Sequence, residues 1–584
     1  MDFFNFFKRN KRINTHSIDP DEIFMDSLNI SGFDQQQFEG VIERSITKKT
    51  FTVAGIIFLL VGVLFLVQLI RLQIVEGKNY LARSENNRLQ HTPLFAERGV
   101  IYDRNQTELA WNSISEDLES DANDTKTPFS VREYIPAGGF AHLIGYVGYP
   151  TKDSSGFFWQ NEIIGKSGVE KRMNEILAGT NGQKIVELDA EQRVLSENLL
   201  TPAQAGGNVS LTIDAGIQQS MYNAIEELAA TGGFEGGAGV IMDVRTGEIL
   251  AITSYPEFDL NILSHGDDRK TIAGYAVDPR HVYLNRAVSG MYTPGSTVKP
   301  YLALGALQEG IITPQTTIFS NGQVEIPNRY NPDQPQVFRD WKKEGHGTTN
   351  VYKAIAESVN TFFYAIGGGY KGQEALGILR IDEYIEKFGI GEKTGIDIDG
   401  EVSGNVPGPD WKARIFPSDP TWRQGDTYNS AIGQFGFQAT TLQMVRAVAA
   451  IANRGSLVQP FVTLNPKATP GAPQPIQGID DKWYTVMHDA MRKTVTEGTA
   501  QSINVPYVHA AAKTGTAQVG ARNAFMNSWS TGFFPVENPR YAFVIVMDNA
   551  KSTNQTGATF VMRKVFDWMH ENVPQYFSLD ESNE

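Results

Sequence analysis

A serine and a lysine near the middle of the chain stand at a spacing that suits attack on a carbonyl group. Ser296 and Lys299 open an apolar stretch over 296–308, directly after Pro294 and Gly295. In a helix, residues three positions apart lie on the same face. A serine hydroxyl needs a base to become a nucleophile, and a partly desolvated lysine is neutral often enough to act as one. The pair therefore predicts a nucleophilic serine at a helix N-terminus, where backbone N–H groups favour developing negative charge.

Two further motifs supply a second serine, an amide and a second lysine. Ser358 and Asn360 form S-x-N within a strongly helical apolar segment over 351–367. Lys513 begins K-T-G after small residues at 510–512, which suit a strand that lets a ligand backbone approach closely. These residues are candidate catalytic and binding groups, although each motif taken alone also fits an ordinary polar surface.

Each motif also occurs elsewhere in the chain, so context has to decide between the copies. A second S-x-x-K spans Ser45–Lys48, a second K-T-G spans Lys393–Gly395, and S-x-N recurs at Ser27, Ser84, Ser196, Ser502 and Ser552. We interpret Ser45–Lys48 as the basic flank of an apolar segment. Lys393 precedes an acidic turn and is interpreted as structural, which leaves Lys513 as the functional lysine.

The elements that must position these residues alternate between strand and helix patterns from about residue 208 onward. Strand patterns lie at 208–214, 237–244, 248–255 and 541–548, and helical patterns lie at 217–232, 351–367, 441–455 and 556–572. Strands at both ends of this region with helices between them predict an α+β domain. Before it, the chain has strand-like pieces at 142–148 and 184–190, an acidic loop at 112–126, and a plausible boundary at Gly206-Gly207.

An uncharged segment at 51–70 is long enough to cross a membrane, because a bilayer core needs about 20 apolar residues in a helix. A cleaved signal peptide has a shorter apolar region and a cleavage site, so we interpret this segment as a signal anchor. Arg44, Lys48 and Lys49 precede it, which favours a cytoplasmic N-terminus and an extracytoplasmic remainder.

The composition excludes several classes of protein. The 584 residues carry 66 acids against 51 bases, a net charge of −15, and no cysteine. An acidic chain is unsuited to nucleic acid as its main partner. The absence of cysteine excludes disulfides, thiolate metal sites and a cysteine nucleophile.

The three motifs, in this order and with their flanks, resemble the class B penicillin-binding proteins, most closely the elongation (rod-system) branch. The matching stretches are Arg98–Asn105, GKSGVEK at 165–171, LTID at 211–214, NRAVSGMYTPGSTVKP at 285–300, DWKKEGHG at 340–347, GDTYNSAIGQFG at 425–436 and KTGTAQ at 513–518. The resemblance covers the chain from 90 to about 570.

This resemblance implies a fold and a domain order. The fold is α+β, a penicillin-binding transpeptidase domain in which helices flank an antiparallel sheet, after a single transmembrane helix and a small β-rich pedestal. The expected domains are a cytoplasmic tail at 1–49, an anchor at 50–71, a pedestal (dimerisation-like) domain at 72–207 and a transpeptidase domain at 208–584. The stretch between Asn105 and about Arg132 is short for the family, so we expect no full head subdomain in the pedestal.

The resemblance also implies the chemistry. The substrate is the D-Ala-D-Ala end of a peptidoglycan stem peptide, and Ser296 forms the acyl-enzyme with Lys299 as general base. Ser358 relays a proton to the leaving D-Ala, while Asn360 and Lys513 hold that network. Thr514, Gly515 and Thr516 bind substrate, and the N–H groups of Ser296 and Thr516 form the oxyanion hole. β-Lactams acylate Ser296 as substrate mimics.

No cofactor and no metal are expected. Some elongation-type relatives hold a metal near the second motif with acidic residues, a histidine and a cysteine. Asp340 and His346 are present here, but the chain has no cysteine to complete such a site.

Other functions fit parts of the same pattern. A D,D-carboxypeptidase or β-lactamase-like hydrolase would use water in place of the acceptor amine, and a β-lactam-binding sensor or silent scaffold would not turn over. The complete motif set favours a cell-wall transpeptidase of the membrane. Its expected partners are stem peptides, β-lactams, a SEDS-type membrane glycosyltransferase and the elongation machinery.

Overall fold

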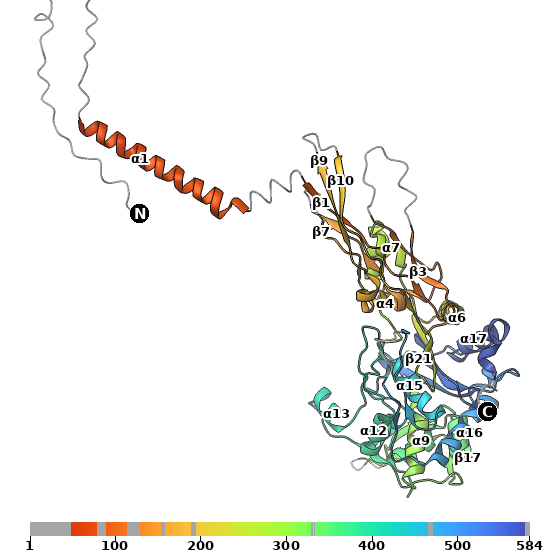
Figure 1. The fold of residues 1–584 in the computed structure, drawn as a ribbon. Helices are drawn as coiled ribbons and strands as arrows, with labels where there is room; N and C mark the ends of the chain where they lie inside the picture. The colour runs from red at the N-terminus through yellow and green to blue at the C-terminus, as the bar shows by residue number, and fades with distance from the viewer. Residues whose placement is uncertain are drawn as a thin grey trace, which may run out of the picture. The chain divides into compact units, whose positions relative to one another are not determined.

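The protein forms two compact units, Met1–Arg88 and Leu89–Glu584, in this computed structural model (Figure 1). The residues that the structure describes are 48–78, 89–113, 129–153, 158–188, 194–328, 331, 333–464 and 471–578. The predicted tail at 1–49 therefore lies almost entirely outside the described residues.

The first unit contains the helix α1 (Lys48–Ile70), which continues as a π-helical turn η3 (Arg71–Val75). None of its side chains is buried, and the run from Phe51 to Ile70 carries no charge. Among the described residues, Lys48–Val75 is the one helix long and apolar enough to cross a membrane. The predicted helix at 50–71 is thus confirmed as a continuous helix.

The second unit begins with small sheets (Figure 1). Its strands are β1 (Leu89–Leu94), β2 (Ile101–Tyr102), β3 (Glu108–Ser113), β4 (Val131–Tyr134), β5 (Val147–Gly148), β6 (Thr151–Lys152), β7 (Phe158–Gln160), β8 (Ile164–Gly165), β9 (Gly182–Leu188), β10 (Val194–Thr201) and β11 (Val209–Ser210). They form the sheets β1-β9-β10 and β11-β2-β3-β4 and the pairs β5-β8 and β6-β7. Strand β11 follows the boundary expected at 207, yet it pairs with β2 in the earlier sheet.

Two expectations for this region need comment. The piece at 142–148 was expected to be strand-like, but it starts inside the short helix α3 (Ala141–Ile144), and only β5 is strand. Strands β3 and β4 pair directly, with Ser113 opposite Val131. Asn112 and Ser113, expected at the start of the acidic loop, belong to β3. Residues 114–128 lie outside the described residues, so the absence of a head subdomain and the rest of the acidic loop remain predictions.

A buried ionic triad joins the first strands to the helix α4 (Gly168–Arg172). The two carboxylate oxygens of Glu170 accept from Arg98 Nε at 2.6 Å and from Arg132 Nε at 2.8 Å. All three side chains are at most 1% exposed. The Glu170 carboxylate is the counter-charge that the buried Arg98 and Arg132 share. Removing it would leave both guanidinium groups without that counter-charge.

A five-stranded antiparallel sheet organises the rest of the unit, in the order β13-β12-β22-β21-β20. Its strands are β12 (Gly236–Asp243), β13 (Ile249–Tyr255), β20 (Ala511–Val519), β21 (Phe525–Phe534) and β22 (Tyr541–Lys551). Strands β12 and β13 come early in this part of the sequence, and β20, β21 and β22 come last. Strand β20, which carries the K-T-G motif, lies at one edge.

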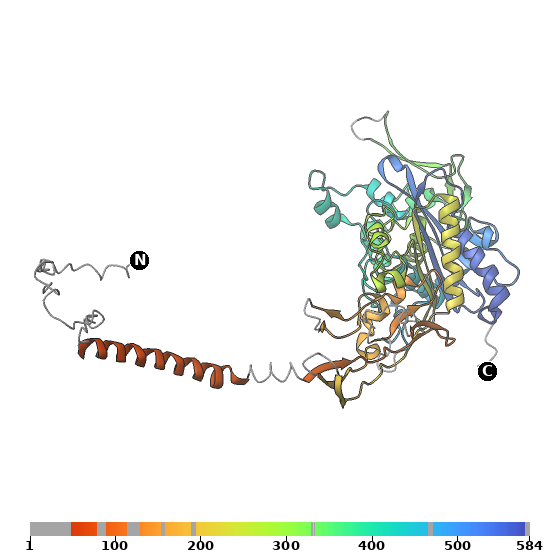
Figure 2. The same cartoon turned by 90° about the horizontal axis from the view of Figure 1, so that it is seen from above.

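Helices cover both faces of this sheet (Figure 2). In β22, Ala542, Val544 and Val546 belong to one apolar cluster with α15 (Thr441–Ala452). The intervening Phe543, Ile545 and Met547 belong to a second cluster with α6 (Ala215–Gly232) and α17 (Thr559–Asn572). Because successive side chains of a strand point to opposite faces, an uninterrupted apolar strand serves both clusters.

Most of the remaining elements lie between β13 and β20; α5 comes before β13, η7 lies between β20 and β21, and η8 is at the C-terminus. They are α5 (Asn174–Leu177) in the first part, then α7 (Leu260–His265), α8 (Arg269–Val277), η5 (Gly295–Val298), α9 (Lys299–Gln308), β14 (Ile318–Ser320), β15 (Gln323–Ile326), β16 (Gln336–Arg339), β17 (Gly347–Thr349), α10 (Val351–Ala356), α11 (Asn360–Gly368), α12 (Gly377–Lys387), α13 (Pro409–Ile415), α14 (Gln424–Ala431), β18 (Ser456–Leu457), β19 (Gln474–Pro475), α16 (Asp481–Thr496), η6 (Gln501–Ile503), η7 (Ala521–Asn523) and η8 (Pro574–Phe577). The predicted α+β class, with helices on an antiparallel sheet, is confirmed.

The helix predicted at 351–367 is not continuous, because it is broken between α10 and α11. Ser358 lies at the break with φ +55°, a left-handed conformation that a serine rarely adopts. The apolar period continues across the break, so the pattern of burial could not reveal it.

Replacing Glu170 by Gln should lower the free energy of unfolding by about 3–5 kcal/mol, because two buried guanidinium groups lose their shared carboxylate. The measurement is chemical denaturation of the detergent-solubilised protein. Glu197→Gln is the matched control, since Glu197 pairs with Lys184 at 3.1 Å on the surface and should contribute only about 0–1 kcal/mol. Equal losses in the two variants would contradict the importance assigned to the triad.

Candidate active site

The S-x-x-K motif forms a tight turn before a buried helix. Ser296 lies in the 3₁₀ turn η5, and the amide of Lys299 donates to the Ser296 carbonyl. A 3₁₀ helix has about three residues per turn, so positions i and i+3 are aligned along it. The α-helix α9 begins only at Lys299, with Pro300 in its first turn. The sequence correctly placed the serine at a helix start, but it did not reveal the 3₁₀ geometry.

Three glycines allow the backbone segments around Ser296 to approach one another closely. A Cβ atom on Gly515 would lie 2.8 Å from the Pro294 carbonyl oxygen, and one on Gly433 would lie 2.2 Å from the Gly295 carbonyl oxygen. Gly295 itself has φ +55°, and its amide donates to the Gly433 carbonyl at 3.1 Å. Ser296 is thus held between the edge strand β20 and the loop after α14.

The Lys299 side chain is fully buried and reaches the S-x-N motif. Its Nζ donates to Asn360 Oδ1 at 2.7 Å, to the Ser358 carbonyl at 2.8 Å and to Ser358 Oγ at 3.3 Å. The ammonium also lies 5.3 Å from the centre of the Phe363 ring. Lys299 therefore links the S-x-x-K motif, to which it belongs, to the S-x-N motif.

Lys513 completes the cluster from β20. Its Nζ donates to Ser358 Oγ at 2.9 Å and to the Thr514 carbonyl at 2.7 Å, and its side chain is fully buried. The hydroxyl of Ser358 therefore accepts from both lysines. The left-handed backbone of Ser358 is strained for a serine, and such strain is typical of sites where side-chain position matters more than local stability.

Burial changes the acid–base behaviour of both lysines. Desolvation lowers the pKa of Lys299 to about 7, an effect that the Asp340 carboxylate partly opposes. The pKa of Lys513 is also held far below its usual range, first by desolvation and then by the nearby charge of Lys299. A substantial fraction of Lys299 is therefore neutral near pH 7 and able to accept a proton.

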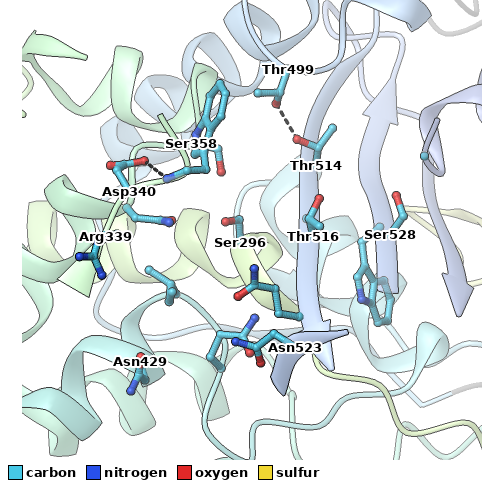
Figure 3. A pocket seen from close by; sticks show the side chains of 18 of the residues that line it. Ser296, Arg339, Asp340, Ser358, Asn429, Thr499, Thr514, Thr516, Asn523 and Ser528 are labelled. Atoms are coloured by element: carbon cyan, nitrogen blue, oxygen red, sulfur yellow. Dashed lines mark hydrogen bonds between the residues drawn. The ribbon is translucent and has the colours of Figure 1, made fainter. Parts of the chain in front are cut away.

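A cleft of about 1070 Å³ opens over Ser296. Strand β20 forms one wall, where Thr516 is exposed and Thr514 Oγ1 lies 2.5 Å from Thr499 Oγ1 (Figure 3). The opposite wall contains residues of β16 and its following loop, including Arg339 and Trp341. As an edge strand, β20 offers backbone donors and acceptors to an extended peptide.

His346 interacts both with Asp340, which follows β16 and lines the cleft, and with Glu357, which follows α10. His346 Nδ1 lies 2.6 Å from Glu357 Oε2, and His346 Nε2 lies 3.4 Å from Asp340 Oδ1. The chain has no cysteine, so the donor set expected for the metal of some relatives lacks that ligand here.

The structure brings together all the predicted site residues. Ser296, Lys299, Ser358, Asn360, Lys513, Thr514, Gly515 and Thr516 either line the cleft or contact each other at its floor. The duplicate motifs behave differently: Thr394 and Gly395 donate to Glu401 and do not line the cleft, and Lys48 belongs to α1 of the other unit. Ser45 lies outside the described residues.

Sequence reasoning missed several cleft residues. Thr499, Asn429 and Gln434 line the cleft from α16's following turn and from the α14 region. Arg339 directly precedes the matched stretch 340–347 but was not singled out. No spacing signal links these residues to Ser296, because only the fold brings them to the same cleft.

Comparison with known proteins identifies the family. Residues 237–567 match the model of the penicillin binding protein transpeptidase domain, and residues 125–211 match that of the penicillin-binding protein dimerisation domain. The chain belongs to the penicillin-binding proteins. Its relatives place it more narrowly, among the class B proteins of the elongation type.

The relatives include the peptidoglycan D,D-transpeptidase MrdA of Escherichia coli strain K12, which is 32% identical over 88% of this chain and 92% of its own length. MrdA of Acinetobacter baumannii is 31% identical over 88% of this chain and 87% of its own length. Among solved structures, PBP2 of Pseudomonas aeruginosa in complex with WCK 5153 is 28% identical with a TM-score of 0.67, covering 85% of this chain and 100% of its own. PBP2 of Helicobacter pylori in complex with MreC has a TM-score of 0.66 at 28% identity, with 83% and 99% covered.

We expect the purified protein to hold much less than one equivalent of zinc, because the cysteine of the relatives' donor set is missing. Elemental analysis after exposure to zinc and dialysis measures this, with His346→Ala as the comparison. A stoichiometric zinc ion that is lost in His346→Ala would contradict the prediction.

Proposed function

We propose that the protein is a peptidoglycan D,D-transpeptidase that cross-links stem peptides through a serine acyl-enzyme during cell-wall elongation. The observation that carries this is the shared Ser358 hydroxyl, which accepts from Lys299 at 3.3 Å and Lys513 at 2.9 Å at the floor of the cleft holding Ser296. The family and its named D,D-transpeptidase relatives support the same conclusion.

In the first step, Ser296 Oγ attacks the carbonyl carbon of the penultimate D-Ala, and its proton passes to neutral Lys299. The lowered pKa of Lys299, about 7, supplies that neutral form near pH 7. The backbone N–H groups of Ser296 and Thr516 stabilise the negative carbonyl oxygen, at about 3 kcal/mol per donor.

The C–N bond then breaks, and the terminal D-Ala leaves as an amine. Ser358 passes a proton from Lys299 to the leaving nitrogen, while Asn360 holds Lys299 and Lys513 holds the Ser358 hydroxyl in place. The hydrogen bonds of Lys299 to Asn360 and of Lys513 to Ser358 support these roles. The terminal carboxylate of the substrate is bound by Lys513 and by Thr514 and Thr516, with Gly515 allowing the close approach.

In the second step, an amine of a neighbouring stem peptide attacks the acyl-enzyme and gives up its proton along the same path in reverse. The product is a new amide bond and free Ser296. A β-lactam enters the first step as a mimic of D-Ala-D-Ala, but its leaving nitrogen remains tethered, so the acyl-enzyme persists.

The proposed domain order is a cytoplasmic tail at 1–49, an anchor at 50–71, a pedestal at 72–207 and a transpeptidase domain at 208–584. The apolar helix α1 and the basic residues before it support a cytoplasmic N-terminus and an extracytoplasmic catalytic domain. The matched structures include a PBP2–MreC complex and a peptidoglycan synthase complex. They support a proposed partnership with a SEDS-type glycosyltransferase and other elongation proteins.

Ser296→Ala should abolish labelling by fluorescent penicillin, because it removes the hydroxyl that attacks the β-lactam carbonyl. The measurement is gel fluorescence after incubation of the purified protein, with its melting temperature as a folding control. Ser528→Ala is the matched control, since Ser528 also lines the cleft and should remain labelled like the wild type. Labelling that persists in Ser296→Ala would show that Ser296 is not the residue that penicillin acylates.

Product analysis separates transpeptidation from hydrolysis. With a pentapeptide donor and an acceptor amine, a transpeptidase gives the cross-linked amide, whereas a carboxypeptidase gives the shortened peptide alone. Exclusive hydrolysis in the presence of excess acceptor and of the membrane partner would favour the hydrolase.

The rate of acylation by penicillin should rise about tenfold per pH unit up to about pH 7 and level off above it, since the base must be neutral. A lysine with its usual pKa would instead give a rate that climbs beyond about pH 9. Stopped-flow or labelling kinetics across this range make the measurement, corrected for spontaneous β-lactam hydrolysis. A continued climb between about pH 8 and 10 would contradict the role of Lys299.

A further inference from the structure

The two walls of the cleft differ in charge. Among the described residues that line it, Arg339 is the only lysine or arginine and Asp340 is the only carboxylate. Asp340 is 6% exposed, and its oxygens accept from the amides of Trp341 and Thr361. Of the two charged side chains that line the cleft in the described part of the chain, Arg339 is the exposed one.

The Arg339 guanidinium has no partner within the part of the chain that the structure describes. Its side chain is exposed at the end of β16, and no hydrogen bond or ion pair involves it. The backbone of Arg339 is fixed by two contacts. Its carbonyl accepts from Tyr364 Oη at 3.3 Å, and in the pairing of β15 with β16 it lies opposite Gln323. A fixed backbone with a free cation is a suitable arrangement for binding an anion.

The position of Arg339 separates it from the carboxylate subsite on β20. In Figure 3, Arg339 lies on one side of Ser296, and Thr514 and Thr516 lie on the other. Asn429, whose amide can also donate, lies on the same side as Arg339. The terminal carboxylate of D-Ala-D-Ala, placed against β20, would therefore leave Arg339 unoccupied.

We propose that Arg339 is a specificity-determining residue that binds a second carboxylate of the peptide substrate, on the side of Ser296 away from β20. This inference rests on the proposed function, because it concerns substrates of the same serine. A guanidinium binds a carboxylate through two parallel hydrogen bonds, which a lysine cannot reproduce.

Two parts of the substrates can carry such a carboxylate. One is the donor stem peptide, through an acidic residue upstream of its D-Ala-D-Ala end. The other is the acceptor, when its amine and a carboxylate are attached to the same carbon. The chemistry is the same in both cases, so the experiment must vary the two substrates separately.

The test measures KM for two matched pairs of substrates with wild type, Arg339→Gln and Arg339→Lys in the full-length detergent-solubilised enzyme. The first pair is a donor pentapeptide with its upstream carboxylate free or amidated. The second pair is an acceptor amine with its neighbouring carboxylate free or amidated. Arg269→Gln is the control, because Arg269 is exposed on α8 and does not line the cleft.

In wild type we expect KM for the carboxylated member of one pair to be lower than for its amide, by a factor on the order of 10 to 100. Arg339→Gln should remove this difference by raising KM for the carboxylated compound alone. Arg339→Lys should restore part of it, and Arg269→Gln should leave it unchanged. The pair that responds identifies the source of the carboxylate.

An unchanged preference in both pairs for Arg339→Gln would overturn the proposal. An equal loss with carboxylated and amidated compounds would also overturn it, because that pattern indicates a structural role. Acylation of Ser296 by penicillin serves as the separate control. It shows whether Ser296 stays reactive in Arg339→Gln. Failure of the proposed function would appear separately, as a wild type that forms no cross-linked amide with any donor and acceptor.

Discussion

The site depends on keeping two lysine side chains buried within hydrogen-bond distance of one serine hydroxyl. Two ammonium groups in a water-excluded site repel each other and lose their hydration. Specific hydrogen-bond acceptors compensate for this. Asn360 Oδ1 and the Ser358 carbonyl accept from Lys299, and the Thr514 carbonyl accepts from Lys513. The part of the desolvation and repulsion energy that these bonds do not offset lowers the pKa of each lysine. A lowered pKa is what a general base at neutral pH requires.

The fold around this cluster can be understood as the means of holding three distant segments together. The apolar strand β22 gives the sheet two packed faces, and β20 extends it to an edge beside η5. Glycines at 295, 433 and 515 remove the Cβ atoms that would keep these backbones apart. The left-handed backbone of Ser358 turns its hydroxyl toward both lysines. The strained backbone at Ser358 lowers the stability of this segment, and packing of the surrounding core compensates for that loss.

Much of the fold was predictable from periodicity, and much of the detail was not. The helix at 217–232 and the strands at 237–244 and 248–255 follow from local patterns and reappear as α6, β12 and β13. The helix break at Ser358 and the helix α3 within 142–148 did not follow, because burial patterns record which face is apolar and do not record backbone dihedral angles. Arg339 was missed for a different reason, since a lone arginine at the end of a strand has no characteristic spacing.

The sequence by itself determined the residue types of the chemistry, their order and the apolar helix near the N-terminus. It could do so because motif order and hydropathy are properties of the linear chain. Sequence context already favoured the K-T-G that begins at Lys513, and the tertiary structure supplies the physical reason. Lys513 lies on the edge strand and donates to Ser358, whereas Thr394 and Gly395 donate to Glu401. Only the tertiary structure decided the protonation of the lysines and the charge of the cleft, because desolvation and proximity arise only when distant segments are packed together.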